Sequence, residues 1–440
     1  MEVETLPENI KEKITSMQMR HSTASLAIAV ALLVGCASLA WAQKAGPAGI
    51  VIPSSSIAGP NDAGVKAHTN IEIMNVPALV GATPNIPGAP GAPFYGYGYE
   101  TPAAIACIYE LVLPQVPGCN PNLAYMNPTG GSRAIAIVDA FDDPNAGVDF
   151  AAFSAQFGIF GGGLTVTYAQ PGLFPGVCSA ANPGPVPPVD ITGGWEVEES
   201  LDIEWAHAMA PGAHIYLVEA QSNSYNDLFC AVSYAQGLVS GAGGGEISMS
   251  WGGGEFGVEA IFDFYFSSGP SRVVYFASAG DSPGTEYPCT SPEVVCVGGT
   301  STGRNPNTLN FTVETDWQDT GGGPSLVFGG RNAPDVSADA NPNNGVWVLD
   351  TYLCPGCWYI VGGTSVSSPT WAGIVNNAGS FANAGSSGTG GSELYKLYRD
   401  PSTDFNDITI GSCGPYTAYL ATVGWDYCTG RGSPRGYNGK

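Results

Sequence analysis

The sequence is poor in positive charge. Of its 440 residues only 14 are Lys or Arg, against 38 Asp and Glu, so the formal net charge is -24 at pH 7. Nucleic acids and anionic membrane surfaces repel such a chain, and we exclude both as partners. With so few cations the chain stays close to neutral at about pH 4, where carboxylates begin to protonate. The composition therefore suits an acidic environment.

Long apolar runs are missing as well. The run from 24 to 34 is too short to cross a membrane as a helix, so we expect no membrane insertion. Lys11, Lys13 and Arg20 precede this run, and Ala40-Trp41-Ala42 follows it as a small-x-small site. This order is typical of an export signal. The sequence therefore predicts a signal peptide at 1–42 and a secreted or periplasmic protein.

An alternative processing site lies within the same segment. Leu33-Val34-Gly35-Cys36 is similar to a bacterial lipoprotein box. Cleavage there would leave Cys36 at the new N-terminus with a lipid anchor. Both forms of export stay open at this point.

Eleven cysteines are present, and ten remain once Cys36 is set aside. An even number in an exported chain indicates disulfides. The spacing predicts these pairs: Cys107 with Cys119, Cys178 with Cys230, Cys289 with Cys296, Cys354 with Cys357, and Cys413 with Cys428. The Cys354-Pro-Gly-Cys357 spacing also occurs in redox and metal half-sites, but no second such pair or nearby histidine accompanies it. A structural disulfide is favoured.

The chain changes character near residue 94. Residues 43–93 are rich in Gly, Pro, Ala and Asn and predict a leader or short pro-segment. From 94 to 440 buried strands alternate with helices, which predicts one α/β domain with a doubly wound, mostly parallel sheet and helices on both faces. The expected strands are 134–138, 214–218, 246–250, 273–277 and 294–297, and the expected helices include 150–157 and 196–211.

A serine begins one of these helices. In Gly363-Thr364-Ser365 small residues precede the apolar stretch 371–375, with Pro369 four residues after the serine. A helix N-terminus stabilises developing negative charge, so Ser365 is a candidate nucleophile. The simpler alternative is an ordinary helix cap.

Three carboxyls are candidate partners of that serine. Glu198 and Asp202 are four residues apart and share one face of the predicted helix 196–211. A solvated acidic face is the alternative, although Trp205 argues that this helix is partly buried. Asp281 follows the strand 273–277 in a glycine-containing turn, where aspartate is common for conformational reasons alone.

These three motifs, Glu-x-x-x-Asp, Ser-Ala-Gly-Asp and Gly-Thr-Ser-x-x-x-Pro, together resemble the sedolisin family of serine-carboxyl peptidases, which belongs to the subtilisin clan. The resemblance extends over 94–440. Further matching segments are Ala136-Ile137-Val138-Asp139-Ala140, Ser248-Met249-Ser250-Trp251-Gly252-Gly253, Pro334-Asp335-Val336 and Gly424-Trp425-Asp426.

The resemblance implies a subtilisin-like fold and a role for each candidate. Ser365 is the nucleophile, Glu198 the general base and acid, Asp202 its orienting partner, and Asp281 the acid at the oxyanion. Glu199 is adjacent to Glu198, so a shift of one residue in the assignment is the main risk. A Glu base still works in mild acid where a histidine is protonated, and Asp281 donates a hydrogen bond only when it is protonated.

A subtilisin-type Asp-His-Ser peptidase is the nearest alternative. Asp139 ends its strand as the acid of such a triad would, and Ser365 would serve unchanged. The chain has only four histidines, however, and none lies in a His-Gly-Thr setting. We therefore expect His207 and His214 to be structural and Asp139 to lie near Glu198.

The C-terminal part resembles the calcium site of the same family. The resemblance implies one Ca²⁺ bound by Asp407, Asp426 and the carbonyls of Ile408, Thr422 and Gly424, which are the oxygen ligands this ion prefers. A glycine is usual where Thr422 stands, but a carbonyl ligand tolerates that exchange. An acidic turn that closes the fold is the alternative.

The prediction is a secreted, acid-acting serine-carboxyl endopeptidase that acts as a monomer on protein or peptide substrates. The family usually carries a long folded pro-region, whereas only about 50 residues separate the predicted signal from residue 94 here. Either the pro-region is absent or residues 43–93 replace it. A non-catalytic, calcium-binding interaction protein on the same fold is the alternative from another class of function.

Overall fold

The computed structural model describes residues 44–45, 49–75, 99–112, 119–120, 124–172, 178–179, 182–268, 272–305, 307–308, 310–379 and 393–440. The predicted signal peptide, Cys36 with its lipoprotein alternative, and residues 76–93 lie outside these ranges. Within them, no helix has the length and apolar character that a membrane crossing requires.

The central sheet has the strand order β13-β12-β10-β8-β5-β7-β6, with β16 also paired to β12. Every pair is parallel except β12 with β13. The strands are β5 (Ala134–Ala140), β6 (Gly163–Tyr168), β7 (His214–Ala220), β8 (Gly245–Met249), β10 (Val273–Ser278), β12 (Val295–Arg304), β13 (Phe311–Asp316) and β16 (Val336–Asp339). Continuous apolar runs form the inner strands because both faces of the sheet are covered. The predicted mostly parallel sheet is confirmed.

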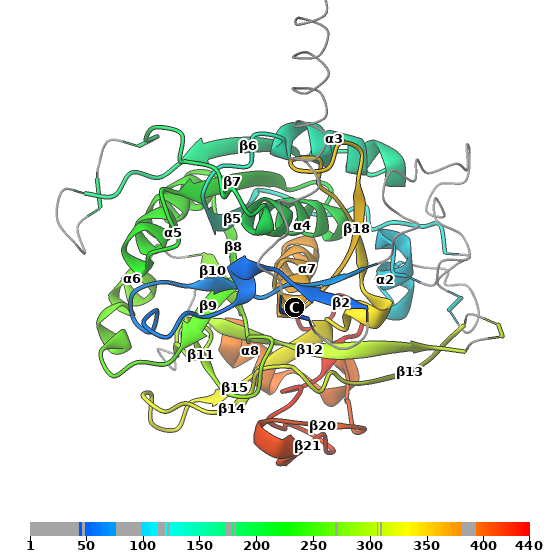
Figure 1. Ribbon diagram of the computed structural model, residues 1–440. Coiled ribbons are helices and arrows are strands. Elements are labelled where there is room, and N and C mark those ends of the chain that lie inside the picture. Colours follow the sequence, from blue (N-terminus) through cyan, green and yellow to red (C-terminus); the bar gives the residue numbers. More distant parts are fainter. Residues whose placement is uncertain are drawn as a thin grey trace, which may run out of the picture. The chain divides into compact units, whose positions relative to one another are not determined.

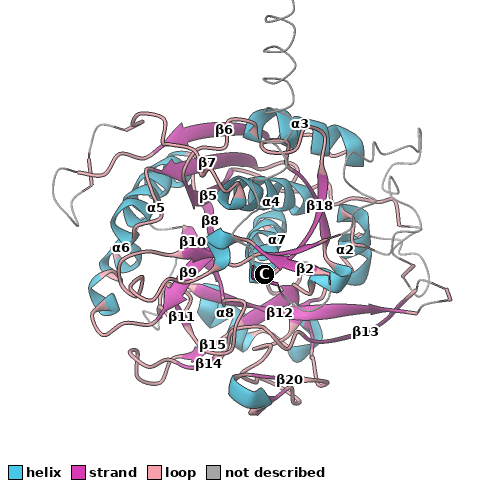
Figure 2. Cartoon of the chain, in the orientation of Figure 1, coloured by secondary structure: helices cyan, strands magenta, loops and turns pink. Residues whose placement is uncertain are grey.

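Helices cover both faces of this sheet (Figures 1 and 2). On one face Ile135 and Ile137 of β5 join the core formed with α3 (Ala146–Phe157), α4 (Gly194–Met209) and α7 (Thr364–Ala378). On the other face Ala136 and Val138 pack in the core formed with α5 (Tyr225–Gly241) and α6 (Phe264–Ser267). Successive side chains of β5 thus point into two different cores, one on each face of the sheet, as expected of a doubly wound sheet.

Smaller elements surround this framework. The helices α2 and α8 are Pro102–Ile108 and Glu393–Arg399. Short 3₁₀ helices span Ser54–Ser56, Glu259–Ile261, Pro342–Asn344, Ser402–Asp404 and Pro415–Thr417. Two-stranded sheets join β14 (Gly323–Pro324) to β15 (Asn332–Ala333), β19 (Phe405–Asn406) to β22 (Ser433–Pro434), and β20 (Ser412–Cys413) to β21 (Tyr419–Leu420).

The segment expected to be a leader contributes strands to the fold. One sheet has the order β1-β2-β4-β18-β17 and another the order β11-β9-β3. Their strands are β1 (Lys44–Ala45), β2 (Ile50–Ile52), β3 (His68–Thr69), β4 (Glu72–Met74), β9 (Trp251–Gly254), β11 (Glu286–Tyr287), β17 (Val346–Leu349) and β18 (Trp358–Gly362). The boundary near residue 94 stays a prediction, but residues 49–75 pack against the domain that follows it.

All five predicted disulfides are present. They include the Cys354–Cys357 pair, so this spacing forms a bridge and not a metal half-site. Disulfides persist in oxidising compartments, which agrees with an extracellular protein.

Candidate active site

Ser365 lies in the first turn of α7 and is fully buried. The helix is capped by Gly363, with φ of +104°, so Ser365 is not an ordinary cap residue. A Cβ at Gly363 would lie 2.1 Å from the carbonyl oxygen of Asn70 and 2.4 Å from Oδ2 of Asp281. Glycine is therefore required where a carbonyl and a carboxyl both approach the start of α7.

Helix α4 presents Glu198 and Asp202 to the same buried region, beside α7 (Figure 1). Both side chains are fully buried, so the alternative of a solvated acidic face is wrong. The Ser365 hydroxyl lies near enough to Glu198 to lower the pKa of that carboxyl, although it donates its hydrogen bond to the carbonyl of Ser250 at 3.2 Å.

Ser250 connects these groups, and its role was not predicted. It directly follows β8, and its hydroxyl donates to Oδ1 of Asp202 at 2.8 Å. The same hydroxyl lies 3.3 Å from the carbonyl oxygen of Ser365. The signal for it was the Ser248–Gly253 match, but only the fold shows that Ser250 links Asp202 to Ser365.

Asp139, the second-last residue of β5, lies beside this pair, as expected from its strand. It is fully buried, and neither carboxyl oxygen has a hydrogen-bond partner among the described residues. Burial raises its pKa to about 8. Its charge in turn raises the pKa of both Glu198 and Asp202, in each case after the larger effect of burial. Three neighbouring buried carboxyls cannot all ionise, so the cluster shares protons.

This cluster changes the expectation for the base. The sequence argument used the ordinary pKa of a glutamate, but burial and then the charge of Asp202 raise the pKa of Glu198 well above that value. In the closed arrangement Glu198 is therefore protonated in acid. Glu198 can accept a proton only when it is ionised, and water that reaches the cluster favours this form because it lowers the pKa.

Asp281 approaches the start of α7 from the turn after β10. Its Oδ1 accepts hydrogen bonds from the N–H and the hydroxyl of Thr364, at 2.7 and 2.9 Å. Within the described ranges its Oδ2 has no partner. Burial first, and then the charge of Glu72, raise its pKa well above the ordinary value. A neutral Asp281 has a free O–H to donate beside Ser365, which the predicted role requires.

Histidines occupy other surroundings. The buried His207 packs on Phe150, with 4.6 Å between ring centroids, and its Nδ1 lies 3.1 Å from the hydroxyl of Ser154. Burial lowers its pKa to about 4. His214 is hydrogen-bonded to Thr165 at 2.8 Å. Both contacts are structural, as predicted, and they give no support to an Asp-His-Ser triad.

Four of the five predicted calcium ligands are hydrogen-bonded in two pairs. The N–H of Gly424 donates to both oxygens of Asp407, at 3.2 and 3.0 Å. Asp426 accepts from the N–H of Thr422 at 2.9 Å. Ile408 follows Asp407 directly and is buried. Two carboxylates joined by a turn of exposed backbone match the donor chemistry of a hard cation.

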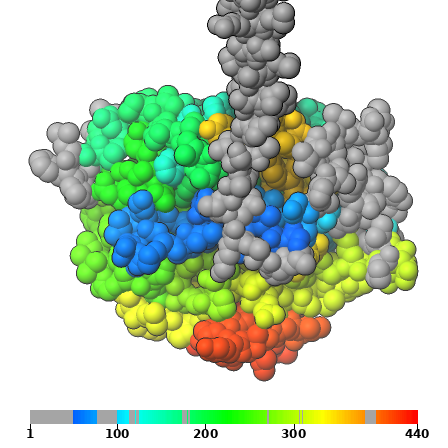
Figure 3. Space-filling model, in the orientation of Figure 1, coloured from blue at the N-terminus to red at the C-terminus, as the bar shows by residue number. Residues whose placement is uncertain are grey.

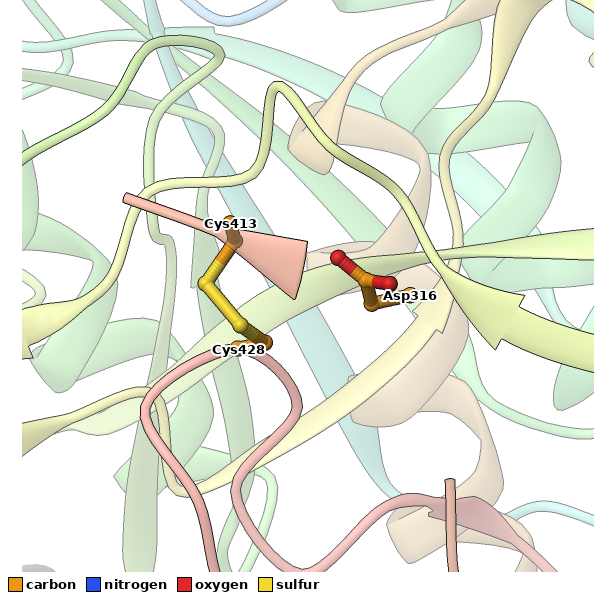
Figure 4. A group of neighbouring side chains, drawn as sticks. All are labelled: Asp316, Cys413 and Cys428. Carbon is orange, nitrogen blue, oxygen red and sulfur yellow. A yellow bond between two sulfur atoms is a disulfide. The ribbon is translucent and has the colours of Figure 1, made fainter. Parts of the chain in front are cut away.

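A third carboxyl lies nearby. Asp316 is next to Cys413 and Cys428 (Figure 4), and its buried Oδ2 has no partner in the described part of the chain. Burial and then the charge of Asp426 raise its pKa to about 6. The two cysteines form a disulfide, so their sulfurs are not thiolate ligands and this trio is not itself a metal site.

Known proteins match this chain in sequence. The pattern of the subtilase family matches residues 191–389. Kumamolisin from Bacillus sp. (strain MN-32) is 30% identical over 294 residues, which are 57% of this chain and 51% of that protein. Sedolisin from Pseudomonas sp. (strain 101) is 31% identical over 199 residues, or 39% of this chain and 33% of that protein. The chain spans about half the length, or less, of these curated relatives.

A solved structure matches the fold. Pseudomonas sedolisin, a serine-carboxyl proteinase complexed with two molecules of pseudo-iodotyrostatin, superimposes with a TM-score of 0.57 and 22% identity. The match covers 77% of this chain and 95% of that one. It shows that the subtilisin-like arrangement of sheet and helices is common to both.

Proposed function

We propose that this chain is a member of the sedolisin family and a serine-carboxyl endopeptidase that cleaves peptide bonds in proteins or peptides. One observation carries the proposal. Ser365 from α7, Glu198 and Asp202 from α4, and Asp281 from the turn after β10 surround a single buried position.

Each side chain has a defined role in this reaction. Ser365 attacks the peptide carbonyl while Glu198 takes its proton, and Glu198 then gives that proton to the leaving amine. Asp202, held by the hydroxyl of Ser250, orients Glu198. The backbone N–H of Ser365 and the O–H of Asp281 stabilise the oxyanion.

We propose that the enzyme acts outside the cell and in acid. The net charge of -24 and the five disulfides support this setting. A protonated Asp281 supports it as well, because the donor at the oxyanion is lost when that carboxyl ionises. The non-catalytic alternative explains none of the buried, unpaired carboxyls, which are costly to a fold that has no use for them.

The test is hydrolysis of casein at about pH 4. The wild-type chain is expected to digest casein, and Ser365→Ala is expected to lose the activity while unfolding at the same temperature. Equal digestion by both proteins would remove Ser365 as the nucleophile and, with it, the proposed function.

We also propose that the loop with Asp407 and Asp426 binds one Ca²⁺, with the carbonyls of Ile408, Thr422 and Gly424. The ion would neutralise the two carboxylates and tie the ends of the loop together. Removing it with a chelator is expected to lower the midpoint of thermal unfolding by roughly 5 °C or more, because a ligand of the folded state stabilises it.

The measurement is thermal unfolding of the Ser365→Ala chain, which avoids self-digestion. Ca²⁺ is expected to restore the midpoint after chelation, and Mg²⁺ is the control ion. Asp407→Asn removes one carboxylate ligand, so neither chelation nor added Ca²⁺ should change its midpoint. The variant should still fold, because Asp407 is exposed and the asparagine oxygen can still accept from Gly424. A wild-type midpoint that chelation leaves unchanged would contradict the proposal.

A further inference from the structure

Three apolar side chains are exposed to solvent on the segment that follows β9. Val258, Ile261 and Phe264 are 59%, 73% and 67% exposed. They recur every three residues through the 3₁₀ helix Glu259–Ile261 and the start of α6, so they share one side of these helical turns. We call these three residues the apolar ridge.

The acidic side chains of the same segment face the protein. Glu259 is buried, and its Oε2 accepts from the N–H of Phe256 at 2.8 Å. Oδ1 of Asp263 accepts from the hydroxyl of Tyr287 at 3.0 Å. Burial raises the pKa of Glu259 to about 8 and that of Asp263 to about 6, so both carboxyls are neutral at about pH 4. Inward acids and outward apolar residues reverse the usual arrangement of a surface helix.

The core does not need the ridge, because other residues of the segment already anchor it. Phe262 and Tyr265 pack on Phe229 of α5, with 5.0 and 5.2 Å between ring centroids. Phe266 packs on Tyr275 of β10 at 5.1 Å. Apolar side chains that stay exposed on a well-anchored segment are typical of an interaction surface.

The ridge follows directly on β9, which is one wall of the candidate active site. β9 pairs antiparallel with β3, and Thr69 lies opposite Trp251. The next residue, Asn70, accepts a hydrogen bond at its carbonyl oxygen from the N–H of Ser365 at 3.1 Å. An extended chain on β9 therefore runs towards Ser365, and its upstream part runs towards the end of β9, where the ridge segment begins. Figure 3 shows residues 50–75, in blue, on the surface of this face of the molecule.

The upstream part of residues 50–75 reaches the ridge segment. A Cβ at Gly64 would lie 2.9 Å from the ring of Phe256, two residues before Val258. Figure 1 likewise shows α6 beside the loop of this blue segment. Since each residue of an extended chain advances about 3.3 Å, a substrate that takes the same path along β9 brings residues well upstream of the cleaved bond to the ridge.

We propose that the apolar ridge is a second contact surface for polypeptide substrates, and that it binds an uncharged, apolar stretch upstream of the cleaved bond. This inference rests on the proposed function. Its occupant follows from the surface itself: every exposed residue in the range 254–268 is uncharged, so burial of apolar area drives the contact and charge does not. The ridge contributes affinity for long substrates and takes no part in the chemistry at Ser365.

The experiment compares two peptides at about pH 4. The short peptide spans a bond that the enzyme cleaves in casein, and the long peptide is the same sequence extended at its N-terminus by alternating Leu and Ala. The double variant Ile261→Ser, Phe264→Ser is expected to raise KM for the long peptide at least about tenfold and to leave kcat unchanged. Its hydrolysis of the short peptide and its thermal unfolding should match the wild type, because both positions are exposed.

Phe160→Ser is the matched control. Phe160 is an exposed aromatic residue too, but it precedes β6, at the edge of the sheet opposite to the strand ends near Ser365. This variant should cleave both peptides like the wild type. An extension of alternating Ser and Ala should bring no gain over the short peptide, since it offers little apolar area to bury.

Three results would overturn the inference and leave the peptidase function standing. The first is a wild-type KM that is equal for the short and long peptides. The second is a double variant that loses both peptides to the same degree. The third is a wild-type dimer that the double variant dissociates in sedimentation, which would assign the ridge to a contact between two copies of the chain. Failure of the wild type to cleave casein or either peptide would overturn the proposed function itself.

Discussion

Glu198→Gln is expected to reduce peptide hydrolysis by about 10²–10⁴-fold, whereas Glu199→Gln should keep most of it. The two residues are adjacent on α4 and fully buried, but their neighbours differ. The pKa of Glu198 responds to Asp202, Asp139 and the Ser365 hydroxyl. After burial, the main influence on the pKa of Glu199 is the charge of Glu219, on β7 and away from Ser365.

Glutamine is a matched replacement at both positions. Burial raises both pKa values well above normal, so each side chain is neutral in acid and has nearly the shape of the amide. Both variants should therefore fold, but glutamine at 198 cannot take the proton of Ser365. The measurement is kcat/KM for a peptide at about pH 4, with thermal unfolding as the control. Loss of activity in Glu199→Gln alone would shift the assignment of the base by one residue.

The parallel sheet was predictable, and the candidate catalytic residues could be selected, because local sequence carries the signal of both. Strands such as β5 are continuous apolar runs, and Asp139 ends its run at the edge where functional groups of parallel strands gather. Gly363 marks the start of α7 because only glycine accepts its positive φ and the close approach of Asp281. Each of these features depends on only a few neighbouring residues, so it can be recognised in the sequence before the fold is known.

The strands of residues 49–75 left no such signal. β3 and β4 have two and three residues, and each exists only because a distant strand, β9 or β18, offers an edge to pair with. Short strands depend on their partners more than on propensity. The hydrogen bonds of Asn70 to Ser278 and Glu286 could not be predicted for the same reason, because Asn70 is more than 200 positions away from both.

The ionisation of the site could not be predicted either. An argument from ordinary pKa values treats each carboxyl as if it were in water. The fold instead gathers Asp139, Glu198 and Asp202 in a dry cluster, and burial is the largest cause of each shift. Burial of this kind follows from tertiary packing, which composition and spacing do not report.

The same burial predicts that the folded protein loses stability as the pH rises. Burial raises the pKa of Asp139 and Asp143 to about 8, of Glu196 to about 9 and of Glu219 to about 10. In the unfolded chain these groups titrate near about pH 4. The folded state therefore binds more protons than the unfolded state above that pH, and its stability falls as the pH rises towards the folded pKa values.

We expect the unfolding midpoint of the Ser365→Ala chain to be at least roughly 10 °C lower at about pH 8 than at about pH 4, because several groups contribute together. Differential scanning calorimetry across this range measures it. Glu219→Gln is the matched variant: it cannot ionise, so its midpoint should fall less steeply with pH than that of the parent. A midpoint that rises from acid to neutral pH would show that these carboxyls ionise without cost in the folded state, and the dry cluster beside Ser365 would then not exist as described. A fold stable only in acid would also confine any activity to that range, whatever the ionisation of Glu198.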